Sequence, residues 1–128
     1  MADYSEVKDS GKRQQFNTGS KRDTQDGKGR YDLLPTYALS RLAKHFQNGA
    51  VKYDEDNWRL GQPLRRYLDS AIRHAFKFLE GYRGEDHAVA CAWNMLCLVE
   101  TEEMIKRGLL PKELNDLPNY VIKKEKIK

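Results

Sequence analysis

Two histidines and three acidic residues flank one glycine-rich turn in the sequence. The segment RHAFKFLEGYRGEDH contains His74, Glu80, Glu85, Asp86 and His87. If helices flank this turn as a hairpin, these side chains gather at one end of it. Carboxylate oxygens and imidazole nitrogens bind divalent cations. The spacing therefore predicts a site for a hard divalent cation, and no HExxH motif, glycine-rich phosphate loop or Ser/His/Asp arrangement accompanies it.

An amide interrupts the apolar segment that follows the turn, AVACAWNMLCLV. Asn94 lies seven residues after His87, which is about two helical turns, so the two side chains share a face. A buried amide without a partner costs about 1–3 kcal/mol. Two interpretations stay open: Asn94 bonds to a backbone group or to its counterpart in a dimer, or it forms the wall of a pocket and bonds to a ligand.

A second group of residues suits a nucleotide. Lys52, Asn57 and Trp58 in GAVKYDEDNWRLG supply a cation for phosphate, an amide for a base edge and an aromatic plane for a base. Trp58 is equally consistent with a hydrophobic plug under this loop. Nearer the N-terminus, Arg22 and Lys28 either contact phosphates or are simply solvated.

The charge distribution argues against a nucleic-acid-binding surface. The chain has a formal net charge of +4, but residues 31 to 108 contain eleven basic and eleven acidic side chains. The positive balance belongs to the two ends, which indicates solvated tails rather than a DNA-binding face.

Cysteine usage and hydropathy predict a cytoplasmic protein. Cys91 and Cys97 lie six apart in an apolar segment, which is typical of small buried side chains rather than of a CxxC site. The longest apolar stretch has twelve residues, whereas a membrane-spanning helix needs roughly 20. We therefore expect no membrane association.

Apolar periodicity predicts an all-α fold of three main helices that position these residues. The first is expected over residues 35–47, the second from 63 to a stop at Gly81, and the third from Glu85 or Asp86 to Arg107. A connection of sixteen residues separates the first two helices, a length that suggests a functional loop. Residues 1–30 form an irregular arm, flexible or covering a ligand, residues 31–108 the helical core, and residues 109–128 a tail that is either a short docking helix or an extended arm.

The third helix predicts an oligomer. Residues 88–99 are apolar on all sides except at Asn94, so neighbours should bury this helix all round. Two other helices cannot cover it alone. A second copy of the chain is expected to complete a compact helical bundle, at least as a dimer.

Four segments in order resemble one known family. FNTGSKRDTQDGKGRYDLLP, LAKHFQNGAVKYDEDNW, LDSAIRHAFKFLEG and EDHAVACAWNMLCLVE are similar to phage and bacterial dATP/dGTP diphosphohydrolase domain proteins, over roughly residues 16–103. That family is similar to the all-α MazG-type pyrophosphohydrolases, whose dimers use carboxylates and magnesium. The resemblance implies a nucleotide-pool enzyme, in a phage context and in the bacterial cytoplasm, that splits purine nucleoside triphosphates into monophosphate and pyrophosphate.

The resemblance also implies roles for individual residues. Glu80 and Asp86 are expected as the principal ligands of Mg2+ or Mn2+, with Glu85 and His74 completing the set. His74, Asp86 and His87 are the catalytic candidates, with a histidine as base because its ordinary pKa of about 6.5 lies near working pH. Substrate contacts are assigned to these residues: Arg22, Lys28, Lys52, Asn57, Trp58, Arg73 and Asn94. For Arg73 the alternative is a surface ion pair with Asp69.

One departure from the MazG pattern keeps other functions open. The ExxE and ExxD motifs are missing where those enzymes carry them, so the metal site should contain histidine or be smaller. A protein that binds a nucleotide or cyclic nucleotide without cleaving it is the second hypothesis, and a nucleic-acid-associated helical protein, with salt-sensitive binding, is the third.

Overall fold

The computed structural model describes residues 9–120, which form two compact units joined at Leu34 and Pro35. The described part of the first unit contains an antiparallel hairpin of β1 (Arg13–Gln15) and β2 (Lys21–Asp23), followed by the single turn η1 (Tyr31–Leu33). The tight turn between the strands is closed by two backbone hydrogen bonds between Phe16 and the residues Gly19 and Ser20. The sequence predicts an irregular arm here and gives no sign of this short hairpin, because the alternation that identifies longer strands cannot be detected in three residues.

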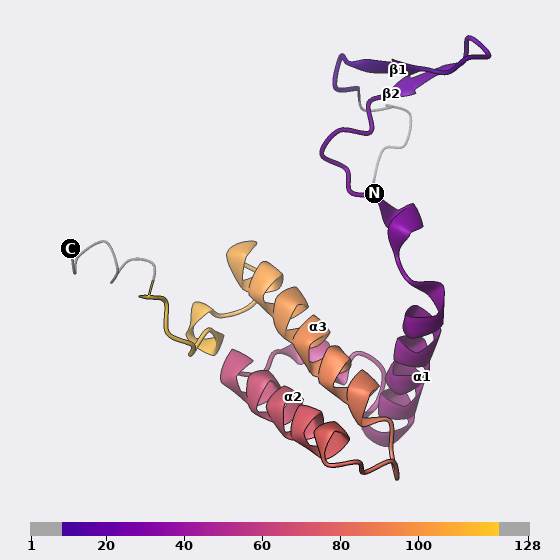
Figure 1. Cartoon of the computed structure of the whole chain (residues 1–128). Coiled ribbons are helices and arrows are strands. Elements are labelled where there is room, and N and C mark those ends of the chain that lie inside the picture. The colour runs from indigo at the N-terminus through magenta and orange to yellow at the C-terminus, as the bar shows by residue number, and fades with distance from the viewer. Residues whose placement is uncertain (1–8, 121–128) are drawn as a thin grey trace. The chain divides into compact units, whose positions relative to one another are not determined.

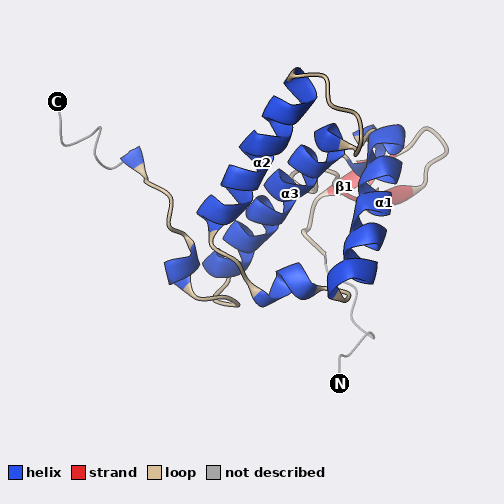
Figure 2. Ribbon diagram, turned by 90° about the horizontal axis from the view of Figure 1, so that it is seen from below, coloured by secondary structure: helices blue, strands red, loops and turns tan. Residues whose placement is uncertain are grey.

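The second unit is all-α, as the sequence predicts, with three main helices and three-residue or four-residue 3-10 turns between and after them. In chain order the elements are α1 (Thr36–Tyr53), η2 (Asn57–Leu60), α2 (Leu64–Leu79), α3 (His87–Lys106) and η3 (Lys112–Leu114). α2 and α3 run antiparallel, and α3 lies between α2 and α1 (Figure 1 and Figure 2).

Helix α1 is longer than predicted. The pair Asn48 and Gly49 was expected to end it, but both residues are helical and α1 continues to Tyr53. The helix ends instead at Asp54, whose φ of 87° stops the helical path and whose amide still donates to the carbonyl of Ala50. The connection to α2 is correspondingly shorter than the predicted sixteen residues.

The observed boundaries of α2 and α3 agree closely with those predicted from the sequence. α2 begins directly after Pro63, and α3 begins after Asp86, whose carboxylate accepts the backbone amide of Val89 at 3.3 Å. This is the usual helix cap by an acidic side chain. α3 ends before Gly108, which has a φ of 75° and so adopts the left-handed conformation that closes many helices.

The core lies between α2 and α3 and is closed by aromatic side chains. Leu64, Tyr67, Cys97 and Leu98 are buried, and Phe46 of α1 packs against them. Trp58 and Trp93 join this cluster, with ring centroids 6.1 Å and 5.9 Å from that of Phe46. The aromatic cluster therefore joins α1 and the 3-10 turn η2 to the α2–α3 pair.

The beginning of the tail docks on this unit. Leu110 and Leu114 lie so close to Gly61 that an added Cβ there would meet them at 3.2 Å and 2.9 Å. Asp116 accepts the backbone amide of Arg65 at 2.8 Å, so it caps the start of α2 from 51 residues away. Residues 121–128, part of the predicted tail, lie outside the described residues.

Replacement of Asp116 by alanine should destabilise the fold. The substitution leaves an amide at the start of α2 without its acceptor, and loss of a helix cap costs about 1 kcal/mol. Urea unfolding followed by circular dichroism should show this decrease in the free energy of unfolding. Asp116→Asn, which keeps an acceptor oxygen, should lose less, and equal losses in both variants would contradict a capping role.

Large apolar side chains are exposed on both α2 and α3. They include Ile72, Phe76 and Leu79 on α2 and Met95, Leu96 and Val99 on α3. Around α3, Val99 lies about 120° and Met95 about 160° from Trp93, which contacts α1, whereas Leu96 lies about 60° from Trp93. We call these six residues the apolar face. Within one chain part of α3 is exposed, and coverage of this part by a second copy stays a prediction.

Candidate functional site

A cavity of about 1000 Å³ opens between the C-terminal half of α1, the loop after it, α2 and the start of α3. This volume is at the upper end of the range for small-molecule sites. The polar and aromatic residues of its wall include His45, Lys52, Asp54, Glu55, Asp56, Asn57, Trp58, Arg66, Arg73, His74, Glu85, Asp86, Trp93 and Asn94. Asp54 and Asp56 both have positive φ, at 87° and 59°, a strained conformation that is common at functional sites.

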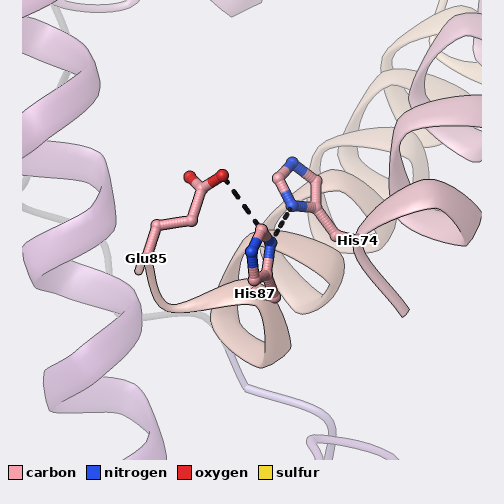
Figure 3. A group of neighbouring side chains, drawn as sticks. All are labelled: His74, Glu85 and His87. Carbon is pink, nitrogen blue, oxygen red and sulfur yellow. Dashed lines mark hydrogen bonds and ion pairs between the residues drawn. The ribbon is translucent and has the colours of Figure 1, made fainter. Parts of the chain in front are cut away.

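Two histidines face one another at one end of this cavity. His74 extends from the fourth turn of α2 and His87 is the first residue of α3, so the turn between the helices brings them together. Their Nδ1 atoms lie 2.9 Å apart, and Glu85 Oε1 lies 3.6 Å from His87 Nδ1 (Figure 3). His87 is buried, with 7% of its surface exposed. Among the described residues, His74, Glu85 and His87 form a group whose ligand atoms all lie within 4.8 Å.

Burial favours the neutral form of His74. Desolvation is the main cause that lowers its pKa, and the charge of Arg73 lowers the pKa further, while Glu85 acts in the opposite direction. A short contact between two imidazoles needs one nitrogen that accepts a hydrogen bond. A neutral His74 satisfies this requirement, and a neutral imidazole is also the form that binds a metal ion or accepts a proton.

Asp86 is already engaged by protein groups. Arg41 of α1 donates from Nε and Nη2 to the two carboxylate oxygens at 2.9 Å and 2.6 Å, and the Val89 amide adds a third bond. The Arg41 guanidinium is the main reason why the pKa of Asp86 lies below its ordinary value. The sequence predicts Asp86 as a ligand and catalytic group; its observed bonds fasten α1 to the start of α3.

Glu80 stands apart from the histidine group. It is the C-terminal cap residue of α2, where its backbone amide donates to the carbonyl of Phe76, and its side chain is exposed. It does not belong to the group of His74, Glu85 and His87. Of the four predicted metal ligands, the structure thus brings together His74 and Glu85.

The predicted nucleotide contacts in the helical unit line the cavity, and several of them have protein partners. Trp58 packs on Phe46, and Arg59 covers its ring at 4.6 Å, so the plug interpretation and the pocket-wall interpretation both describe it. Lys52 lies over the ring of Tyr53 at 5.0 Å. Asn57 lies on the wall beside them.

Asn94 and Arg73 line the same cavity. The side-chain amide of Asn94 donates to the carbonyl of Ala90 at 2.8 Å, which is the backbone bond that one of the two interpretations requires. Because Asn94 also lines the cavity, the ligand-contact interpretation remains open. Arg73 donates to Ser70 at 3.4 Å.

Arg22 and Lys28 belong to the N-terminal unit. They line a smaller hollow of about 290 Å³ there, and Lys28 forms an ion pair with Asp23 at 3.1 Å. Lys28 therefore has a charged partner within the protein, which is an alternative to its predicted contact with phosphate.

Three residues of the site have no signal in the sequence. His45 and Trp93 stack with centroids 5.2 Å apart, and both line the cavity. Trp93 Nε1 is buried and, with Thr101 Oγ1, is one of two such side-chain atoms without a hydrogen-bond partner in the described part of the chain. Arg41 lies 45 residues from Asp86. Contacts between separate helices cannot be read from spacing along one helix.

Stability should depend on pH through His45. Burial is the main cause that lowers its pKa from the ordinary 6.5, although Asp86 and Glu85 partly oppose this shift. The folded chain therefore binds fewer protons than the unfolded chain below about pH 7, and the free energy of unfolding must fall as the pH falls through 6.5. His74 contributes with the same sign.

Urea titrations of metal-free protein between about pH 7.5 and pH 5.5 should show this decline. In His45→Gln the decline should be shallower. An identical pH profile in the variant would remove His45 as a contributor.

No described helix has the length and apolar character needed to cross a membrane. Searches of curated proteins and of solved structures returned no match. The family described as dATP/dGTP diphosphohydrolase, N-terminal, matches residues 18–108, which is more than half of the chain and includes the whole wall of the cavity. The resemblance seen in the sequence is thereby confirmed: the chain belongs to the dATP/dGTP diphosphohydrolase N-terminal domain family.

Proposed function

We propose that this chain hydrolyses purine nucleoside or deoxynucleoside triphosphates to the monophosphate and pyrophosphate, and so controls a nucleotide pool. Support comes from the family and from one structural observation: aromatic, cationic, acidic and imidazole side chains line a single cavity. The cavity is large enough for a drug-sized ligand, a class to which a nucleotide belongs by size. The phage setting and the bacterial cytoplasm are part of this proposal through the resemblance alone.

The wall of the cavity suggests how a nucleotide binds. In this proposal Trp58 and Asn94 contact the base or sugar, and the buried Trp93 N–H donates to an acceptor atom of the ligand. Lys52 and Arg73 supply positive charge for the phosphates. An unpaired buried donor costs about 1–3 kcal/mol, so a ligand that satisfies Trp93 gains from that pairing.

The histidine pair supplies the proposed base. A neutral His74 or His87 accepts a proton from water as the water oxygen bonds to the α-phosphorus. The bond from this phosphorus to the bridging oxygen breaks, and pyrophosphate leaves with the electron pair. The second imidazole holds the first in position through the 2.9 Å contact. General base catalysis of this kind contributes about 10²- to 10⁴-fold.

The residues present fit a resident Mg2+ poorly. Mg2+ prefers oxygen ligands in octahedral geometry. The group of His74, Glu85 and His87 offers two nitrogens and one carboxylate, and Asp86 is bonded to Arg41. Mg2+ therefore remains proposed only as the ion that a nucleotide carries on its phosphates, and a ligand group with two imidazoles is better suited to a first-row transition-metal ion.

We also propose that the functional unit is a dimer formed through the apolar face. Isolated apolar side chains are common on protein surfaces, but six large ones are exposed here on two neighbouring helices. Two α2–α3 pairs related by a twofold axis would bury the same surface of both copies and form a four-helix arrangement.

A nucleotide-binding protein without catalysis is the second candidate. The engagement of Asp86 by Arg41 favours it, since this leaves one carboxylate in the metal-ligand group. Such a protein would retain a nucleotide, or a cyclic nucleotide, at fixed stoichiometry and would show no turnover.

One assay separates the two candidates. Purified protein is incubated with Mg2+ or Mn2+ and each common ribonucleoside and deoxyribonucleoside triphosphate, and products are resolved by ion-exchange chromatography. We expect monophosphate and pyrophosphate in equal amounts from dATP or dGTP. Inorganic phosphate with a diphosphate product, or no product from any nucleotide, would contradict the proposed reaction.

A further inference from the structure

Every histidine of this chain belongs to one corner of the fold. The sequence contains three, and they come from three different helices: His45 from α1, His74 from α2 and His87 from α3. His45 and His74 line the same cavity, and His74 contacts His87 directly. Residues scattered over 42 positions in the sequence thus gather at one end of α3.

The ligand atoms at this corner are arranged for a metal ion. Two imidazole nitrogens bound to one ion at about 2.05 Å would lie about 2.9 Å apart at an octahedral angle of about 90°, and about 3.3 Å apart at a tetrahedral angle. The observed separation of His74 Nδ1 and His87 Nδ1 is 2.9 Å. Glu85 Oε1 lies 3.6 Å from His87 Nδ1, so a carboxylate oxygen is near both nitrogens (Figure 3).

The donor types select among metal ions. Imidazole suits first-row transition metals, whereas Mg2+ and Ca2+ prefer oxygen ligands. Two histidines and one glutamate also leave coordination positions open for water or a phosphate oxygen, as in catalytic metal sites.

We propose that His74, His87 and Glu85 bind one first-row transition-metal dication, of the class that includes Mn2+, Co2+ and Zn2+, with much higher affinity than Mg2+. The open positions of this ion face the cavity, which His74 and Glu85 line. The proposal stands on the ligand set alone and does not depend on nucleotide hydrolysis.

Metal binding can be measured without any nucleotide. The full chain is stripped with a chelator and then titrated with Co2+, Zn2+, Mn2+ and Mg2+ in separate calorimetric experiments, and the Co2+ titration is also followed by visible absorption. We expect one equivalent of Co2+ or Zn2+ per chain, bound at least about 100-fold more tightly than Mg2+. Appearance of cobalt ligand-field bands should saturate at the same equivalence point.

Matched variants test the ligands. His74→Gln and His87→Gln should each weaken Co2+ binding by roughly 100-fold or more, since loss of an outer partner alone costs up to about that much. His45→Gln is the control, because it makes the same chemical change in the same cavity at a residue outside the group of His74, Glu85 and His87. This variant should bind Co2+ with the affinity of the unmodified chain. Glu85→Gln changes an exposed side chain on the turn, so its effect on binding is separable from folding, which circular dichroism monitors.

Several outcomes would overturn the proposal. These are no saturable Co2+ binding, equal affinities for Co2+ and Mg2+, or unchanged affinity in the folded Glu85→Gln variant. Any of them would leave the short contact between His74 and His87 as a hydrogen bond between two imidazoles. A protein that binds metal and cleaves no nucleotide would retain this site and lose only the proposed reaction.

Discussion

His74→Gln should lower kcat for hydrolysis of the preferred purine nucleotide by at least about 100-fold, with little change in the extent of nucleotide binding. The imidazole at this position faces His87 at 2.9 Å and lines the cavity. Its removal takes away the proposed base of the metal-free site, or one ligand of the proposed metal ion, together with the group that faces His87. Glutamine is similar in size and limits the cavity left in the half-buried site.

The measurement is steady-state kinetics of pyrophosphate release, together with equilibrium binding of a nonhydrolysable nucleotide analogue. Lys44→Ala is the matched control, because Lys44 is an exposed residue of α1 next to His45 and does not line the cavity. It should leave both kcat and binding unchanged. If His74→Gln weakens analogue binding in proportion to the loss of kcat, the histidine serves binding and the catalytic assignment fails.

Phe76→Glu should convert the proposed dimer into monomers. Phe76 is 60% exposed at the middle of the apolar stripe on α2, so a charge there does not enter the core of one chain. In the dimer, the twofold symmetry would bring two such carboxylates into one apolar interface. Burial of an unpaired charge costs several kcal/mol, so the two carboxylates destabilise the proposed dimer.

Light scattering coupled to size-exclusion chromatography measures the change directly. The unmodified chain should elute with twice the mass of Phe76→Glu, while circular dichroism should show the same helix content in both. Lys77→Glu alters the charge of the neighbouring position outside the apolar face and should remain dimeric. A monomeric mass for the unmodified chain at high concentration would remove the dimer from the proposal.

The sequence by itself determined the local elements. Periodic apolar residues are sufficient to predict the all-α class and the boundaries of α2 and α3, because proline, glycine and an acidic cap act on neighbouring backbone groups. The same local rules failed at Asn48 and Gly49, where helical packing of α1 continues through a pair that usually ends helices. They also failed for the hairpin of the first unit, whose strands are too short to show a pattern.

Only the tertiary structure decided which side chains meet. The sequence predicts that His74, Glu85 and His87 lie near one turn, and the short distance between His74 and His87 follows from the way α2 packs on α3. The hydrogen bonds from Arg41 to Asp86 depend on where α1 lies. The position of Glu80 outside the group of His74, Glu85 and His87 depends on where α2 ends.

The physical reason is the range of the interactions. Hydrogen bonds within a helix and caps at its ends join residues a few positions apart, so sequence spacing describes them. A functional site joins residues such as His45 and Trp93, whose contact depends on the packing of whole helices. The residue types of this chain therefore indicate nucleotide and metal chemistry, while the packing of three helices determines which of those residues share the cavity.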